Sequence, residues 1–112
     1  MPAKEDFVLS DIESFNRFKD PENGTLFIQL LWSDPKTSDG ISRSHRGEGI
    51  LWGPDVTEAF LARNNLKMII RSHVWEPTGY KIDHDGKCVT IFSAPNYTYI
   101  NIELVLCLIV SI

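Results

Sequence analysis

The sequence has few cysteines, no excess of positive charge and no apolar run long enough to cross a membrane. Only Cys88 and Cys107 occur among 112 residues, which argues against a disulfide-stabilised scaffold and favours a reducing compartment, the cytoplasm or the nucleus. The formal net charge of −4 argues against a nucleic-acid partner. The apolar run Leu104–Val110 has seven residues, whereas a membrane-spanning helix needs roughly 20. We therefore expect no membrane span and interpret the run as a strand.

Familiar short motifs are also missing. The first ten residues, MPAKEDFVLS, lack the apolar stretch of a signal peptide. There is no glycine-rich phosphate loop, no pair of ligands at zinc-site spacing and no evident pair of catalytic carboxylates. What is present is a globular composition, with 43% hydrophobic residues, 7 glycines and 6 prolines, which predicts one small folded domain.

The hydrophobic pattern predicts an α/β (α+β) domain with mixed strands and two helices. One helix is expected from Ser10 to the turn at 20–24, and the other from Gly53 to Asn65. The polar segment 36–49 is expected to be a long loop. The expected strands are Leu26–Trp32, Lys67–Arg71 and a hairpin of Tyr80–Asp83 with Lys87–Phe92, joined through a turn that exposes His84.

Two polar residues lie where functional groups from neighbouring strands often meet, in loops at strand ends. His73 follows the strand Lys67–Arg71, and its imidazole is suited to binding a divalent metal, although a surface histidine is the simpler local interpretation. Arg46 lies beside Gly47 in the long loop. Its guanidinium is suited to holding a phosphate, although a solvated loop arginine explains it more simply.

Other candidates have equally plain alternatives. Asp34, which ends a predicted strand, is suited to orienting a ligand or accepting from Arg46, or else it forms only a local turn. The hydroxyl of Tyr97 is suited to meeting a substrate oxygen, or its ring packs within a loop. Cys88 lies within a strand and is interpreted as a core residue. His45 is capable of acid–base chemistry, but nothing local supports that role.

Three motifs, taken in order, give a more specific signal. They are LLWSDP at 30–35, RSH at 71–73 and SAPNY at 93–97, with Arg46 between the first two. In this order and spacing they resemble the C-terminal half of the catalytic domain of the PPP family of protein serine/threonine phosphatases. The stretch from Gly53 to His73 is most similar to the tetratricopeptide-bearing branch. The resemblance covers 5–97, which we expect to be the phosphatase segment, followed by a divergent apolar tail at 98–112.

The resemblance implies a partial metallophosphoesterase-type β-sandwich with flanking helices, truncated on its N-terminal side. It implies hydrolysis of phosphoserine and phosphothreonine in proteins at a centre of two divalent metal ions (Mn, Fe, Zn or Mg), which polarise the phosphoryl oxygens and activate water. At the matching positions His73 is a metal ligand, Arg46 and Tyr97 hold the substrate phosphate, and Asp34 orients the catalytic site. The implied partners are phosphoprotein substrates and regulatory subunits.

The family's other metal motifs, GDxHG, GDxVDRG and GNHE, do not occur in this sequence, and neither does its HGG motif. The chain thus holds one of the usual ligand residues and lacks the histidine that protonates the leaving oxygen. We expect the chain alone to bind metal poorly and not to hydrolyse phosphoesters. Val74 and Thr98 also depart from the family pattern. A non-catalytic interaction protein, or pseudophosphatase fragment, is the alternative interpretation.

Overall fold

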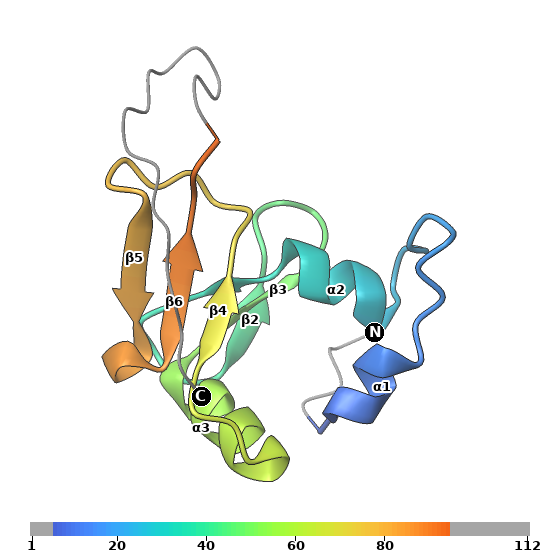
Figure 1. The fold of residues 1–112 in the computed structure, drawn as a ribbon, viewed down its shortest axis with the longest axis horizontal. Coiled ribbons are helices and arrows are strands. Elements are labelled where there is room, and N and C mark those ends of the chain that lie inside the picture. The colour runs from blue at the N-terminus through green and yellow to red at the C-terminus, as the bar shows by residue number, and fades with distance from the viewer. Residues whose placement is uncertain (1–5, 95–112) are drawn as a thin grey trace.

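The computed structural model describes residues 6–94, which form two three-stranded sheets and three α-helices (Figure 1). The first sheet has the order β1-β3-β2, formed by Asp34–Pro35, Ile50–Trp52 and Ile41–Arg43 respectively. The second has the order β4-β6-β5, formed by Ile69–Arg71, Cys88–Ile91 and Tyr80–Asp83. This mixed architecture confirms the expected α+β class. None of the helices within 6–94 is long and apolar enough to cross a membrane.

Each sheet combines one parallel and one antiparallel pair of strands. β3 is parallel to β1 and antiparallel to β2, whereas β6 is parallel to β4 and antiparallel to β5. Parallel neighbours end at the same edge of their sheet. The segment after β4, which contains His73, and the segment after β6, which begins the SAPNY motif, therefore leave the second sheet at one edge. Tyr97 and the tail at 98–112 lie outside the described residues.

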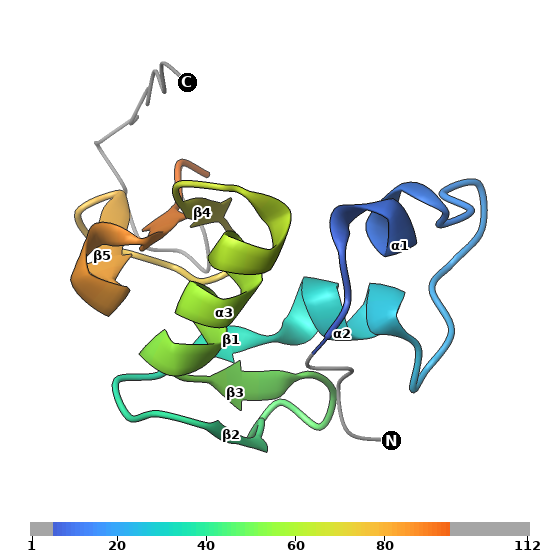
Figure 2. The ribbon, with the colours of Figure 1, turned by 90° about the horizontal axis from the view of Figure 1, so that it is seen from below.

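The helix α3 (Pro54–Asn64) forms where the sequence predicts it. Gly53 is its N-cap, Pro54 occupies the first turn, and Asn65 ends the helix in the left-handed conformation. Leu61 and Thr57 are buried on the inner face. Figure 1 shows α3 at the lower end of the two sheets, and its Thr57 contacts Trp52 of the first sheet and His84, in the turn of the second. Figure 2 shows the same helix from below, in front of the sheets.

The segment Leu26–Trp32 is predicted to be a strand, and this prediction is wrong: it is the helix α2. The hydroxyl oxygen of Thr25 accepts a hydrogen bond from the Ile28 amide and caps the helix. Only Ile28 and Gln29 are buried, whereas Leu30, Leu31 and Trp32 are each more than a third exposed. A short apolar run has no periodicity that separates a strand from a helix, so the cap residue decided the outcome.

The first helix is shorter than predicted. α1 spans Leu9–Glu13, and its N-cap is Val8, whose amide donates to the Asp11 carboxylate instead of Ser10 forming the cap. Phe15 lies beyond the helix and stacks on Phe27 of α2 with ring centroids 5.0 Å apart. Hydrogen bonds to Asp11 therefore fix the start of the helix, and the helical spacing of the phenylalanines does not extend it beyond Glu13. The polar segment 36–49 also differs from expectation, because it contains β2.

The predicted hairpin is present, but the predicted position of His84 is wrong. β5 and β6 pair antiparallel through the short 3-10 turn η1 (His84–Gly86). His84 is buried rather than exposed at the tip, and both of its ring nitrogens have hydrogen-bond partners. The turn folds back onto α3, since Lys87 pairs with Glu58 of that helix at 2.7 Å. A turn motif in the sequence gives no information about what the turn packs against.

Burial also determines the protonation of the thiol of Cys88, a residue of β6. Its side chain is fully buried, as the sequence predicts, and burial raises the pKa of the thiol to about 11. The same thiol ionises near 9 in an unfolded chain. Because the folded pKa is the higher one, the stability that this group contributes is present below about pH 9 and is lost as the pH rises toward 11.

We expect Cys88 to be nearly unreactive in the folded protein. In a Cys107→Ser background, alkylation at about pH 8 should be at least roughly tenfold slower in buffer than in denaturant, since only the exposed thiolate reacts. The measurement is the rate of iodoacetamide labelling by mass spectrometry. Equal rates in the two solutions contradict a buried, protonated thiol.

Candidate functional site

The candidate site is built around the carboxylate of Asp34, at the junction of α2 and β1. The preceding residue, Ser33, is buried and fixes this junction, because its hydroxyl donates to the Gln29 carbonyl and accepts from the Ile50 amide at 3.0 Å. The end of the helix is thereby attached to β3. Asp34 itself pairs in parallel with Leu51 of that strand. The carboxylate therefore projects from a backbone that is held on both sides.

Arg71, at the end of β4, approaches Asp34 from the other sheet. Its guanidinium lies 2.7 Å from Asp34 Oδ1, and it also donates to the Ser33 carbonyl at 3.1 Å and the Thr90 hydroxyl at 3.2 Å. The side chain is only 12% exposed. A guanidinium with three acceptors in a mostly buried position is fixed in space, so Arg71 links the two sheets.

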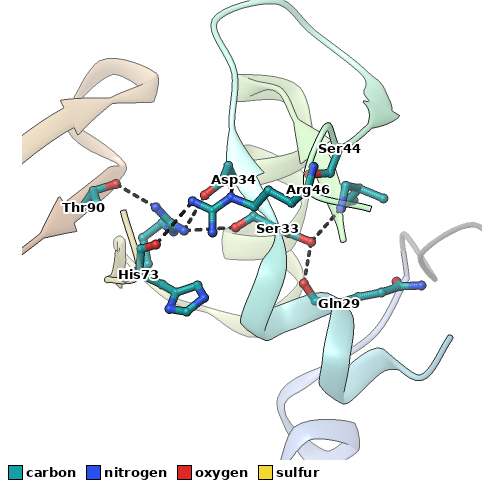
Figure 3. Close-up of polar contacts among 9 residues, drawn as sticks. Gln29, Ser33, Asp34, Ser44, Arg46, His73 and Thr90 are labelled. Carbon is teal, nitrogen blue, oxygen red and sulfur yellow. Dashed lines mark hydrogen bonds and ion pairs between the residues drawn. The ribbon is translucent and has the colours of Figure 1, made fainter. Parts of the chain in front are cut away.

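Arg46 approaches the same carboxylate from the loop after β2. Its Nε lies 2.9 Å from Asp34 Oδ2, and its Nη2 donates to the His73 carbonyl at 3.3 Å. Figure 3 shows the guanidinium between these two groups. The contact with Asp34 that the sequence suggested is therefore present. Unlike Arg71, the Arg46 side chain is 31% exposed and can be reached from solvent.

Close packing of the backbone holds the Arg46 loop in this position. Gly49 has a φ of +77°, and a Cβ atom there would lie 2.6 Å from the Trp32 carbonyl carbon. Only glycine allows the loop to approach the end of α2 this closely. At the other end of the loop, the buried Ser44 accepts a hydrogen bond from the Arg46 amide at 3.1 Å.

His73 joins the cluster through its backbone carbonyl, whereas its imidazole ring packs against a different residue. Its φ of +86° is unusual for a residue with a side chain and turns its carbonyl toward Arg46. The imidazole is exposed and packs edge-on against Trp32, with ring centroids 5.2 Å apart. Three sequence-predicted residues, Asp34, Arg46 and His73, therefore come together from three segments of the chain.

The balance of charge favours an anionic ligand. Two guanidinium groups share one carboxylate, which leaves the cluster with a net positive charge, and Arg46 is the member that faces solvent. A guanidinium presents parallel N–H donors that match the oxygens of a phosphate. The arrangement is therefore suited to holding a phosphoryl group at Arg46.

The family comparison agrees with this chemistry. Residues 3–77 match the family model described as calcineurin-like phosphoesterase. The chain belongs to this family.

Phosphoesterase relatives include protein serine/threonine phosphatases. The chain is 51% identical over 89 residues to serine/threonine-protein phosphatase 5 of Solanum lycopersicum and 47% identical over 95 residues to that of Homo sapiens. These matches cover 80% and 85% of the chain but only 16% and 19% of the relatives. A Saccharomyces cerevisiae protein serine/threonine phosphatase, described as similar to human PP5, matches with a TM-score of 0.78 and 40% identity, over 87% of this chain and 30% of that one. The resemblance to protein serine/threonine phosphatases is confirmed.

Calcineurin-like phosphoesterases depend in general on divalent metals, and the described residues fit only part of such a centre. Within 6–94, no three His, Cys, Asp or Glu side chains lie close enough together to hold a metal ion. The exposed imidazole of His73 is available as one ligand, whereas the Asp34 carboxylate is already paired with two arginines. A single imidazole is a weak site for a divalent ion, so the other ligands of a metal centre are not among the described residues.

Sequence reasoning assigned no role to Arg71 or Ser33, which hold Asp34 in place. A signal for Arg71 was present, since an arginine that directly follows the apolar run Met68–Ile70 needs a partner when its own side chain is buried. Ser33 gave no such signal, because a serine after a helix or strand is common in any loop. Its importance comes from Gln29 and Ile50, which only the fold brings to it.

Proposed function

We propose that this chain is part of a protein serine/threonine phosphatase that removes phosphate from phosphoserine and phosphothreonine. In this proposal Arg46 binds the substrate phosphate, Asp34 orients Arg46, and His73 is one ligand of a two-metal centre. Tyr97 is proposed to lie beside the phosphate. The metals, when bound, polarise the phosphoryl oxygens and activate water. Phosphoproteins are the proposed substrates, and regulatory subunits and a cytoplasmic or nuclear location are proposed as well.

The observation that supports this proposal is the position of Arg46. Its guanidinium is held by Asp34 and the His73 carbonyl, yet remains partly open to solvent. The two anchoring contacts use Nε and Nη2, and they fix the plane of the group before any ligand binds. A pre-oriented donor loses little conformational entropy on binding an anion. Arg46 should therefore bind phosphate more tightly than a mobile surface arginine would.

Phosphate binding to the full 112-residue chain tests the role of Arg46. We expect inorganic phosphate to perturb the Arg46 side-chain Nε resonance in NMR spectra. Arg46→Gln should weaken phosphate binding by at least about tenfold, since hydrogen bonds to charged groups contribute on the order of 1.5 kcal/mol or more. The matched control is Arg43→Gln, an exposed arginine of β2 in the same stretch of chain, which should leave the affinity unchanged. Equal losses in both variants contradict a specific site.

Activity is tested by grafting residues 5–97 in place of the matching segment of the human relative. The chimera is expected to hydrolyse a phosphoserine peptide, and Arg46→Gln within it should lower kcat/KM by roughly a hundredfold, the effect of removing one donor to a developing charge. The isolated chain is expected to show no turnover. An inactive but folded chimera, together with phosphopeptide binding by the chain, supports the non-catalytic alternative instead.

A further inference from the structure

A closed ring of hydrogen bonds joins four residues from four different segments. The Trp52 indole Nε1–H donates to the Thr57 hydroxyl at 2.9 Å, and the hydroxyl is 2.8 Å from His84 Nδ1. His84 Nε2 is 2.8 Å from the Lys36 carbonyl oxygen, and the Lys36 amide donates to the Trp52 carbonyl at 2.9 Å. The ring thus connects β3, α3, η1 and the residue that follows β1.

For a neutral imidazole, the chemistry of the four groups fixes the direction of each hydrogen bond. A carbonyl oxygen only accepts, so His84 Nε2 must carry a proton and donate it to Lys36. In the neutral imidazole Nδ1 is then an acceptor, and the Thr57 hydroxyl donates to it. The same hydroxyl accepts from Trp52, which has only a donor to offer. Every polar group of these side chains is satisfied in one arrangement.

Burial makes this ring costly to disturb. Thr57 is completely buried and His84 is 8% exposed, so loss of the buried hydrogen bond between them leaves a polar group unpaired. His84 also adopts a φ of +52°, which is uncommon for a residue with a side chain. The backbone at this turn is therefore held in a strained conformation that aims the ring at Lys36.

One member of this hydrogen-bond ring, Lys36, lies two residues after Asp34, which carries the carboxylate of the candidate site. Lys36 follows β1, the two-residue strand that begins with Asp34. The second sheet and its turn therefore hold β1 from both sides, through Arg71 of β4 at Asp34 and through His84 of η1 at Lys36, the residue that follows the strand. The first contact fixes the carboxylate itself, and the second fixes the backbone that follows it.

We propose that His84 is a positioning residue for the phosphate-binding arginine. Through Lys36 it fixes β1, and β1 sets the position of Asp34, which orients Arg46. The inference rests on the proposed function of Arg46, but the chain of contacts is independent of any ligand. It assigns a role to a histidine that contacts neither the phosphate position nor the other members of the site.

Two substitutions of His84 test the hydrogen bonds of its two ring nitrogens separately. The side-chain amide of His84→Gln reaches as far as Nε2 and can still donate to the Lys36 carbonyl. The shorter amide of His84→Asn can accept from Thr57 at the Nδ1 position but does not reach Lys36. Asparagine tolerates the left-handed backbone better than glutamine does, so backbone strain alone predicts the opposite order of effects.

The readout is the rate at which the Arg46 Nε proton exchanges with solvent, measured by NMR on the full chain without ligand. His84→Asn should speed exchange by at least about fivefold, because the Lys36 carbonyl loses its buried partner. His84→Gln should stay within about twofold of the native rate, because the glutamine amide still donates to the Lys36 carbonyl. Lys87→Gln is the matched control, since it removes only the exposed pair with Glu58 from the same turn and should have no effect.

Thr57→Val provides a second route if His84→Asn does not fold. It leaves His84 and Lys36 in place but removes the donor to Nδ1, and should speed Arg46 exchange by at least about twofold. An unchanged Arg46 exchange rate in folded His84→Asn overturns the proposal, as does an unchanged rate in folded Thr57→Val where His84→Asn does not fold. An equal change in Lys87→Gln overturns it as well. If phosphate fails to bind the native chain while Arg46 exchange responds to His84→Asn, the proposed function fails and the positioning role stands.

Discussion

Replacing Arg71 by methionine is expected to lower the free energy of unfolding by at least about 2 kcal/mol, since it removes hydrogen bonds from a charged donor to mostly buried acceptors. Methionine fills much of the space of the arginine stem, so the loss reports the guanidinium. The change leaves the Ser33 carbonyl and the Thr90 hydroxyl without the donor that they share, and removes one of two positive charges from Asp34. The measurement is urea unfolding of the full chain followed by tryptophan fluorescence.

The control for Arg71→Met is Lys19→Met, which removes an exposed pair with Glu22 on the α1–α2 connection. Surface pairs of this kind contribute little, so no measurable change in the unfolding midpoint is expected. Arg71→Lys should recover only part of the loss, because one ammonium cannot reach all three acceptors as the guanidinium fork does. If Arg71→Met and Lys19→Met unfold at the same urea concentration, Arg71 does not stabilise the contact between the sheets.

The second large effect is expected at Gly53, the residue between β3 and α3. Gly53→Ala should destabilise the chain by about 3 kcal/mol, since an added methyl in a closely packed position forces the backbone to shift. The Cβ atom would lie 2.3 Å from the Ser38 carbonyl oxygen and 2.6 Å from the Cα of Asp39. Both neighbours are backbone atoms, so no side-chain rotation relieves the contact.

Gly40→Ala is the matched control for Gly53→Ala. Gly40 has a φ of +81° but nothing within 4 Å of an added methyl, so it carries a conformational cost of roughly 1 kcal/mol without a clash. Gly53 shows the opposite case, with an ordinary φ of −91° and no free space. The two substitutions thus separate steric from conformational effects, as measured by the same urea unfolding. A larger loss at Gly40 than at Gly53 contradicts the packing of the 36–40 loop against α3.

Local sequence signals succeeded where the deciding interaction is also local. The helix Pro54–Asn64 was predictable because its N-cap, first-turn proline and left-handed terminus lie within the helix or next to it. The hairpin of β5 and β6 was predictable because the turn lies between its two strands. The strand prediction for Leu26–Trp32 was wrong because the run is apolar except for Gln29 and shows no clear period, so that the cap at Thr25 was the one local signal of a helix.

For the candidate site, the sequence alone determined which residue types are available and in what order. The three motifs, with Arg46 between the first two, indicated the phosphatase family, and this resemblance singled out Asp34, Arg46 and His73 independently of the fold. The sequence therefore predicted the family and the main candidates of the site.

Only the tertiary structure decided how those residues are held. Arg71 meets Asp34 across 37 positions of the chain, and His84 meets Lys36 across 48. Hydrogen bonds over such separations exist only after the two sheets have packed against α3, and no local pattern encodes them. A buried histidine and an exposed one look alike in a hairpin turn, because what distinguishes them is the packing of residues that are distant in the sequence.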